Sequence, residues 1–88
     1  MIKYLVGLTG EQSFLAEPFY IIRAKNRDAA VKKYDEHMTS EGRTLPPGQE
    51  HFGLVIGVMT IFGPMNLDPR CTRDLATMAG HLAKELEE

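Results

Sequence analysis

The run of residues 52–62 restricts the fold of this chain more than any other segment, because no charged residue interrupts it. Valine, isoleucine and phenylalanine dominate the run, and glycine recurs at Gly53 and Gly57. Such a composition is typical of a strand that is covered on both faces. The run is well short of the ~20 apolar residues that a membrane-spanning helix needs, so we expect a central strand and no membrane partner.

Two further strands are predicted near the beginning of the chain. Residues 2–9 alternate between apolar and other side chains with the period of two that a half-buried strand shows. Residues 14–24 form the second strand, and the two make a hairpin. Pro18 interrupts the second strand, and because proline cannot donate to a strand ladder, it predicts a bulge, a bend or an edge.

Two helices are expected from periodicity and from capping residues. Asn26 is a favourable N-cap for a helix over residues 27–40, in which apolar residues recur at helical spacing. The pair Asp68-Pro69 is a favourable start for a last helix over residues 69–86. Residues 42–51, between the first helix and the apolar run of residues 52–62, hold two adjacent prolines and are expected to form an extended loop.

Together these elements predict a single compact α+β domain over residues 1–88, with the order β-β-α-β-α. We expect a three-stranded, mainly antiparallel sheet with both helices packed on one face. The other face would then be open and apolar, and it would carry Gly53, Val55, Gly57 and Met59. An apolar face of that kind invites a partner chain. A homodimer through this face or through the last helix is therefore one expectation.

Composition excludes several classes of protein. Hydrophobic residues make up 43% of the 88 residues and charged residues 25%, which is typical of a globular domain. The single cysteine excludes an internal disulfide, and we expect a cytoplasmic protein. The chain has neither the glycine-rich dinucleotide fingerprint nor a phosphate loop, so no cofactor is expected.

Cys71 and the three histidines are the candidates for catalysis or metal binding. Cys71 lies between Arg70 and Arg73, where nearby cations would lower the pKa of a thiol. It also begins an apolar seam along the last helix, and this structural role is the favoured interpretation. The histidines are not spaced for a local metal site, so neither catalytic residues nor a metal site are expected; they are His37, His51 and His81.

A cluster of basic residues is the most distinct charged feature. It spans the end of the second strand and the following helix, and it could receive nucleic acid, phosphate or an acidic protein surface. The alternative is an ordinary basic rim, since no aromatic residue is interleaved for base stacking. The cluster consists of Arg23, Lys25, Arg27, Lys32 and Lys33.

The opposite charge collects at the end of the chain, in Glu85, Glu87 and Glu88. Acidic residues are unfavourable at a helix C-terminus because the helix dipole is negative there. The pattern indicates either a frayed end or a second binding surface that faces a basic partner.

Residues 2–6 and 20–34 carry a resemblance to a known group of proteins. A strand hairpin leads into a helix through Ala24-Lys25-Asn26-Arg27-Asp28-Ala29-Ala30. In this layout the chain resembles small α+β proteins of phages and mobile elements, among them inhibitors of bacterial defence systems such as anti-CRISPR proteins. The resemblance implies a small inhibitor that acts in the host cytoplasm.

These observations lead to three hypotheses of function. The first is a non-catalytic binding protein that blocks a surface of another macromolecule, such as a CRISPR–Cas protein complex that handles nucleic acid. The second is a module that binds nucleic acid or nucleotides through the basic cluster. The third is a small enzyme that depends on the thiol of Cys71.

Overall fold

The structure, a computed structural model, describes residues 2–9, 15–40 and 53–86. Five strands and two helices are formed there. In chain order they are β1 (Ile2–Thr9), β2 (Leu15–Ala24), α1 (Arg27–Ser40), β3 (Gly53–Thr60), β4 (Gly63–Met65), α2 (Arg73–Leu82) and β5 (Lys84–Glu85).

The strands form one sheet in the order β4-β3-β1-β2-β5. β1 lies in the centre and pairs antiparallel with both β2 and β3. β5 is the exception, because it pairs parallel with β2. The α+β class is thus confirmed, but the sheet is mixed and has five strands. The two strands that were not predicted are edge strands of three and two residues, too short to show a hydrophobic period.

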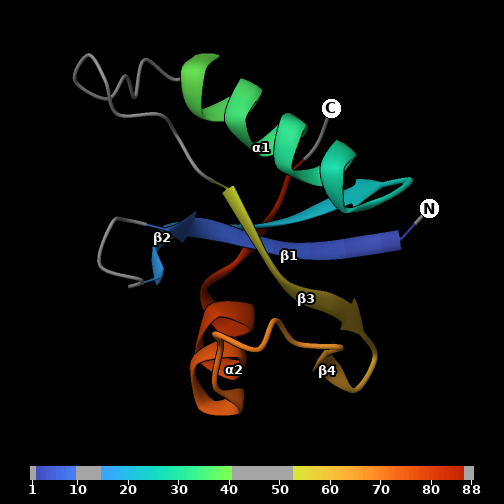
Figure 1. The fold of residues 1–88 in the computed structure, drawn as a ribbon, viewed down its shortest axis with the longest axis vertical. Coiled ribbons are helices and arrows are strands. Elements are labelled where there is room, and N and C mark those ends of the chain that lie inside the picture. The colour runs from blue at the N-terminus through green and yellow to red at the C-terminus, as the bar shows by residue number, and fades with distance from the viewer. Residues whose placement is uncertain (1, 10–14, 41–52, 87–88) are drawn as a thin grey trace.

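The two helices cover opposite faces of the sheet, so the prediction that both pack on one face is wrong (Figure 1). The reason lies in β1, where side chains on both faces are buried. Tyr4 and Val6 pack in the core beneath α1, whereas Leu5 packs in the core beneath α2. A sheet that is apolar on both sides needs a covering layer on each.

The open apolar face that the sequence predicted is not formed, because β3 does not alternate regularly. Leu5 pairs with Gly57 and Val6 with Val55, which leaves Ile56 as an extra residue in a bulge. Val55 therefore packs beneath α1 with Val58, whereas Ile56 packs beneath α2. The expectation that this strand is covered on both faces is confirmed. It is an inner strand, but β1 rather than β3 is at the centre of the sheet.

A second bulge confirms the prediction at Pro18. Val6 pairs with Tyr20, but Leu8 pairs with Ala16, so three residues of β2 lie opposite a single residue of β1. Such a bulge re-aims the side chains of the longer strand. The ring of Phe19, which is 4% exposed, lies in the core beneath α2.

α1 forms as its sequence predicts. The Asn26 side-chain oxygen accepts a hydrogen bond of 2.8 Å from the backbone N–H of Ala29. This is the geometry of an N-cap, in which a side chain satisfies one of the free amides of the first turn. Ala30, Tyr34 and Met38 follow at intervals of four residues and are buried against the sheet.

α2 begins later than predicted, because Asp68 caps a turn before the helix. Its carboxylate accepts a hydrogen bond of 2.9 Å from the backbone N–H of Arg70. Its own N–H donates to the carbonyl of Ile56, which attaches the segment to β3. The helix N-cap is Thr72, whose hydroxyl accepts from the N–H of Leu75. The helix ends at Leu82, since the next residues extend along β2 as β5.

We expect Thr72→Ala to lower the free energy of unfolding by about 1 kcal/mol, the usual cost of losing an N-cap side chain. Chemical denaturation of the wild type and the variant measures the difference. Thr77→Ala is the matched control, because the Thr77 hydroxyl only donates back to the carbonyl of Arg73 within the helix. Equal losses in the two variants would contradict the assignment of the cap.

Candidate functional surface

The interior of the protein offers little chemistry. Within residues 2–8, 18–40 and 53–86, no polar or charged residue is buried. No group of three or more metal-ligating residues is found in this part of the chain. No helix there is long and apolar enough to cross a membrane. A functional site in the described residues is therefore to be sought on the surface.

Cys71 belongs to the core beneath α2, together with Leu5 and Phe19. It is 8% exposed and precedes the helix rather than lying in its first turn. Burial raises the pKa of the thiol, and the nearby Asp68 carboxylate raises it further, against a smaller opposing effect of Arg70. The thiolate, which is the nucleophile, is thereby disfavoured.

We expect Cys71 in the folded protein to react with a thiol reagent at least about a hundredfold more slowly than in the unfolded chain, because the thiol is buried and protonated. Absorbance of a disulfide reagent at pH 8, with and without urea, measures both rates. Rapid modification of the folded protein would contradict the structural role and restore the thiol enzyme as a hypothesis. Folding raises the pKa of the Cys71 thiol above its ordinary value of 9.0. The stability that the buried thiol contributes is therefore full below pH 9.0 and is lost as the pH rises through the raised pKa.

The histidines do not gather in the described part of the chain. The His37 ring contacts the Tyr20 ring edge-on, and its Nε2 lies 3.2 Å from the Tyr20 hydroxyl oxygen. His81 lies exposed on α2, and His51 is outside the described residues. The contacts of His37 are those of a packed aromatic side chain on the surface of the core.

The structure brings four of the five predicted basic residues to the corner between β2 and α1. Arg23, Lys25 and Arg27 are exposed there. The Lys33 ammonium donates a hydrogen bond of 2.8 Å to the carbonyl of Arg23, which fixes its side chain at the same corner. The corner also lies near Asp68. The pKa of the Asp68 carboxyl is lowered mainly by hydrogen bonds from the backbone N–H and guanidinium of Arg70, and the charge of Arg27 adds a smaller effect in the same direction.

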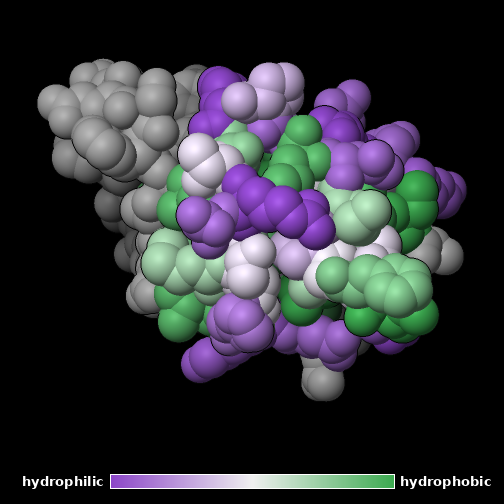
Figure 2. Space-filling model, turned by 90° about the horizontal axis from the view of Figure 1, so that it is seen from below, coloured by the Kyte–Doolittle hydropathy of each residue, from purple (hydrophilic) through white to green (hydrophobic). Residues whose placement is uncertain are grey.

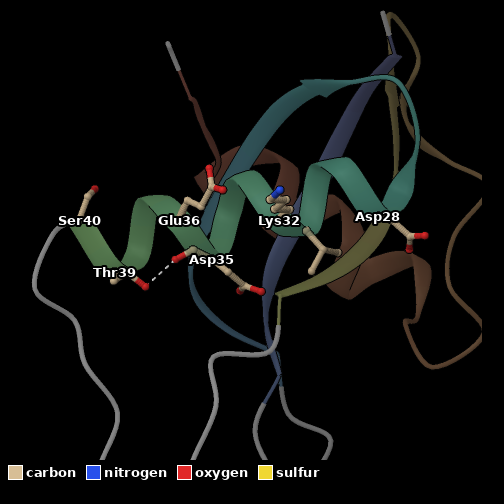
Figure 3. Close-up of a pocket in the computed structure, with 7 residues that line it drawn as sticks. Asp28, Lys32, Asp35, Glu36, Thr39 and Ser40 are labelled. Carbon is tan, nitrogen blue, oxygen red and sulfur yellow. Dashed lines mark hydrogen bonds between the residues drawn. The ribbon is translucent and has the colours of Figure 1, made fainter.

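Lys32 is separated from this corner. It lines an open hollow along one side of α1, among acidic and hydroxyl side chains (Figure 3). The other residues of the hollow are Asp28, Val31, Asp35, Glu36, Thr39 and Ser40. Val31 packs against the core beneath α1 and one carboxylate oxygen of Asp35 is buried, so only the exposed part of the hollow has the alternating charge of a solvated helix face.

The acidic end of the chain is only partly described. Glu85 lies in β5, not at the end of a helix, and its carboxylate is 3.4 Å from the ammonium of Lys3. Their side chains are 57% and 42% exposed, so this ion pair contributes little to stability. Glu87 and Glu88 lie outside the described residues.

The most unusual surface feature is the turn between β3 and β4, which sequence reasoning missed. Ile61 is 94% exposed and Phe62 is 81% exposed. Two hydrogen bonds hold the turn: the Thr60 hydroxyl donates to the carbonyl of Gly63 at 2.9 Å and accepts from the N–H of Phe62 at 3.1 Å. Gly63 has φ +95°, a conformation that favours glycine. Gly63-Pro64 was the available turn signal.

In comparisons with known proteins, no family model, no curated protein and no solved structure matches the chain. Function must therefore be argued from the residues of this chain alone. The surface carries two features for that argument, the apolar turn and the basic corner. Figure 2, which views the α2 side, shows hydrophobic surface interrupted by hydrophilic surface rather than one continuous apolar face.

Proposed function

We propose that this protein is a non-catalytic binding protein that acts by occupying a surface of a partner protein. The observation that carries the proposal is the exposure of Ile61 and Phe62, at 94% and 81%, on a turn held by hydrogen bonds. Leaving two large apolar side chains in water forgoes roughly 1.5–3 kcal/mol each, which burial against a partner recovers. Isolated exposed apolar residues are common, but an adjacent pair on a rigid turn is a typical interface anchor.

The specific version of the proposal is an inhibitor of a bacterial defence complex such as CRISPR–Cas, acting in the host cytoplasm. It is supported by the resemblance of residues 2–6 and 20–34 to phage inhibitors of this kind. The buried, protonated thiol of Cys71 supports a mechanism without covalent chemistry. A protein of 88 residues can block a partner by steric exclusion, which needs a surface rather than an active site.

The experiment is a plaque assay on bacteria that carry an active CRISPR–Cas system directed against the infecting phage. Expression of the wild-type chain is expected to restore plaques, and Cys71→Ser is expected to restore them equally. Absence of plaques at a level where the protein is folded would reject the defence inhibitor. Loss of the effect in Cys71→Ser alone, with stability unchanged, would reject the non-catalytic mechanism.

Nucleic-acid binding is the second candidate, favoured by the gathering of Arg23, Lys25, Arg27 and Lys33 at one corner. Few phosphate contacts give weak and strongly salt-dependent binding. Titration of a fluorescent oligonucleotide at low and physiological salt tests it. Tight binding that Arg23→Ala and Lys25→Ala abolish would favour this candidate over a protein partner.

A further inference from the structure

The apolar turn and the basic corner lie at the same end of the sheet. Ile2 pairs with Ala24, the last residue of β2, while Tyr4 pairs with Val58, near the end of β3. The ends of β2 and β3 therefore flank the beginning of β1, only two strand spacings apart, or roughly 10 Å. Figure 1 shows the beginning of β1, the start of α1 and the β3–β4 turn all on the right-hand side, with the start of α1 above β1 and the turn below it.

This end of the molecule combines apolar and cationic side chains in one surface, which we call the docking end. Three of the large hydrophobic residues that are exposed lie at the beginning of β1 and just after β3, and a rim on the β2 side contains three exposed cations. The members of the docking end are Ile2, Ile61, Phe62, Arg23, Lys25 and Arg27. Two acidic residues lie near this rim: Asp28, in the first turn of α1, and Asp68, whose pKa is lowered mainly by Arg70 and to a smaller extent by Arg27.

We propose that the docking end inserts Ile61 and Phe62 into an apolar pocket of a partner protein whose rim is acidic. The inference rests on the proposed function and specifies the chemistry of the partner. Phenylalanine and arginine are enriched at the centres of protein interfaces, and cations on one side of an apolar anchor match carboxylates on the corresponding side of an apolar pocket. The convex shape of a two-residue turn calls for a concave partner.

A second copy of this chain does not fit as the occupant. Ile61 and Phe62 together would bury at most roughly 300–500 Å² per chain, taking the range of about 150–250 Å² that aromatic side chains bury for each. Two turns in contact would bury roughly 600–1,000 Å² in total, below the ~1,200 Å² at the lower end of stable interfaces. Two convex cationic ends would also repel one another.

Anionic membranes and nucleic acids fit less well than an acidic protein. Polybasic membrane anchors usually have about four to eight clustered cations, whereas the docking end has three, and the whole chain has a net charge of −2. Base stacking would use the Phe62 ring but gives no role to Ile61, which is exposed even further.

Photocrosslinking tests the inference in the bacteria of the plaque assay. Phe62 is replaced by the photoreactive residue p-benzoylphenylalanine, which the 81% exposure of the site accommodates without repacking. The matched control carries the same residue at Met78, an exposed apolar position on α2. We expect a crosslinked product at position 62, heavier than a dimer of the chain, and at least about tenfold less product at position 78.

Charge reversal separates the cationic rim from the apolar anchor. Combining Arg23→Glu, Lys25→Glu and Arg27→Glu with the probe at position 62 is expected to reduce the crosslink at least about tenfold, because like charges would then face each other. Lys32→Glu, at an exposed position in the hollow of α1, is the matched control and is expected to leave the yield within about twofold. The crosslinked peptide of the partner is expected to lie beside acidic residues.

Each alternative outcome contradicts the inference in a recognisable way. If no crosslinked product forms at position 62, or if equal amounts form at positions 62 and 78, the docking end is rejected. If the product has the mass of a dimer of the chain, the partner is a second copy. If the chain binds phosphatidylserine–phosphatidylcholine vesicles or oligothymidine, and the reversed charges abolish that binding, the partner is a membrane or a nucleic acid instead of an acidic protein. Plaques without a crosslink reject the docking end alone, and a specific crosslink without plaques rejects the defence inhibitor alone.

Discussion

Replacing Tyr34 with alanine is expected to destabilise the protein more than any other change considered, by about 3–5 kcal/mol. The Tyr34 side chain is fully buried in the core beneath α1 and contacts the Tyr20 ring edge-on. Its hydroxyl donates a hydrogen bond of 2.8 Å to the carbonyl of Pro18 at the bulge of β2. The alanine variant would lose the packing and the hydrogen bond together, and small domains have only about 5–15 kcal/mol in total.

Tyr34→Phe is the matched control, because it removes the hydroxyl and keeps the ring. We expect a loss of about 1 kcal/mol, the usual net value of one hydrogen bond. Urea denaturation followed by circular dichroism gives both free energies of unfolding. If the alanine variant were no less stable than the phenylalanine variant, the ring could not be the centre of this core.

The second large effect is expected at Gly7, which faces the bulge of β2. A Cβ atom built at Gly7 would lie 2.7 Å from Cδ1 and 2.8 Å from Cε1 of the Phe19 ring. It would also lie 3.2 Å from Cδ1 of Ile56, and neither neighbour can move into solvent because both are buried. Gly7→Ala is therefore expected to cost about 1–3 kcal/mol through overpacking.

A double-mutant cycle with Phe19→Leu identifies the cause of this loss. The smaller leucine leaves room for the new methyl group, so the double variant is expected to be more stable than the sum of the single effects by at least about 0.5 kcal/mol. Additive losses would show that Gly7 is required for another reason than the close approach of Phe19.

The sequence predicted the elements whose signals are local. Asn26 as a cap and the spacing of Ala30, Tyr34 and Met38 all indicate the same helix, and α1 has the predicted bounds. Pro18 predicted an irregularity in β2 for a reason that lies in the residue itself, the missing N–H.

The faces and edges of the sheet were not predictable in the same way, because they depend on pairing. The bulge at Ile56 is defined only by the register of β3 against β1, and it changes which side of the sheet Val58 faces. β5 forms because the N–H of Leu86 donates to the carbonyl of Ile21, more than 60 residues away in the chain. No local pattern carries that information.

The sequence predicted only the basic half of the candidate surface. Arg23, Lys25 and Arg27 were identified from charge alone, and the structure places them at one corner with Lys33. The apolar half was missed, because Ile61 and Phe62 continue the hydrophobic run of β3 and were assigned to the strand. A run of apolar residues does not show where the strand ends and a turn begins.

The most direct measurement compares Phe62→Ser with Met78→Ser in the plaque assay, after chemical denaturation of both purified variants. Both side chains are exposed, at 81% and 47%, so each change is expected to alter the free energy of unfolding by no more than about 0.5 kcal/mol. We expect Phe62→Ser to lose inhibition, since removing an interface anchor weakens binding at least about 30-fold, while Met78→Ser remains inhibitory. Equal inhibition by two stably folded variants would contradict a partner contact at the β3–β4 turn.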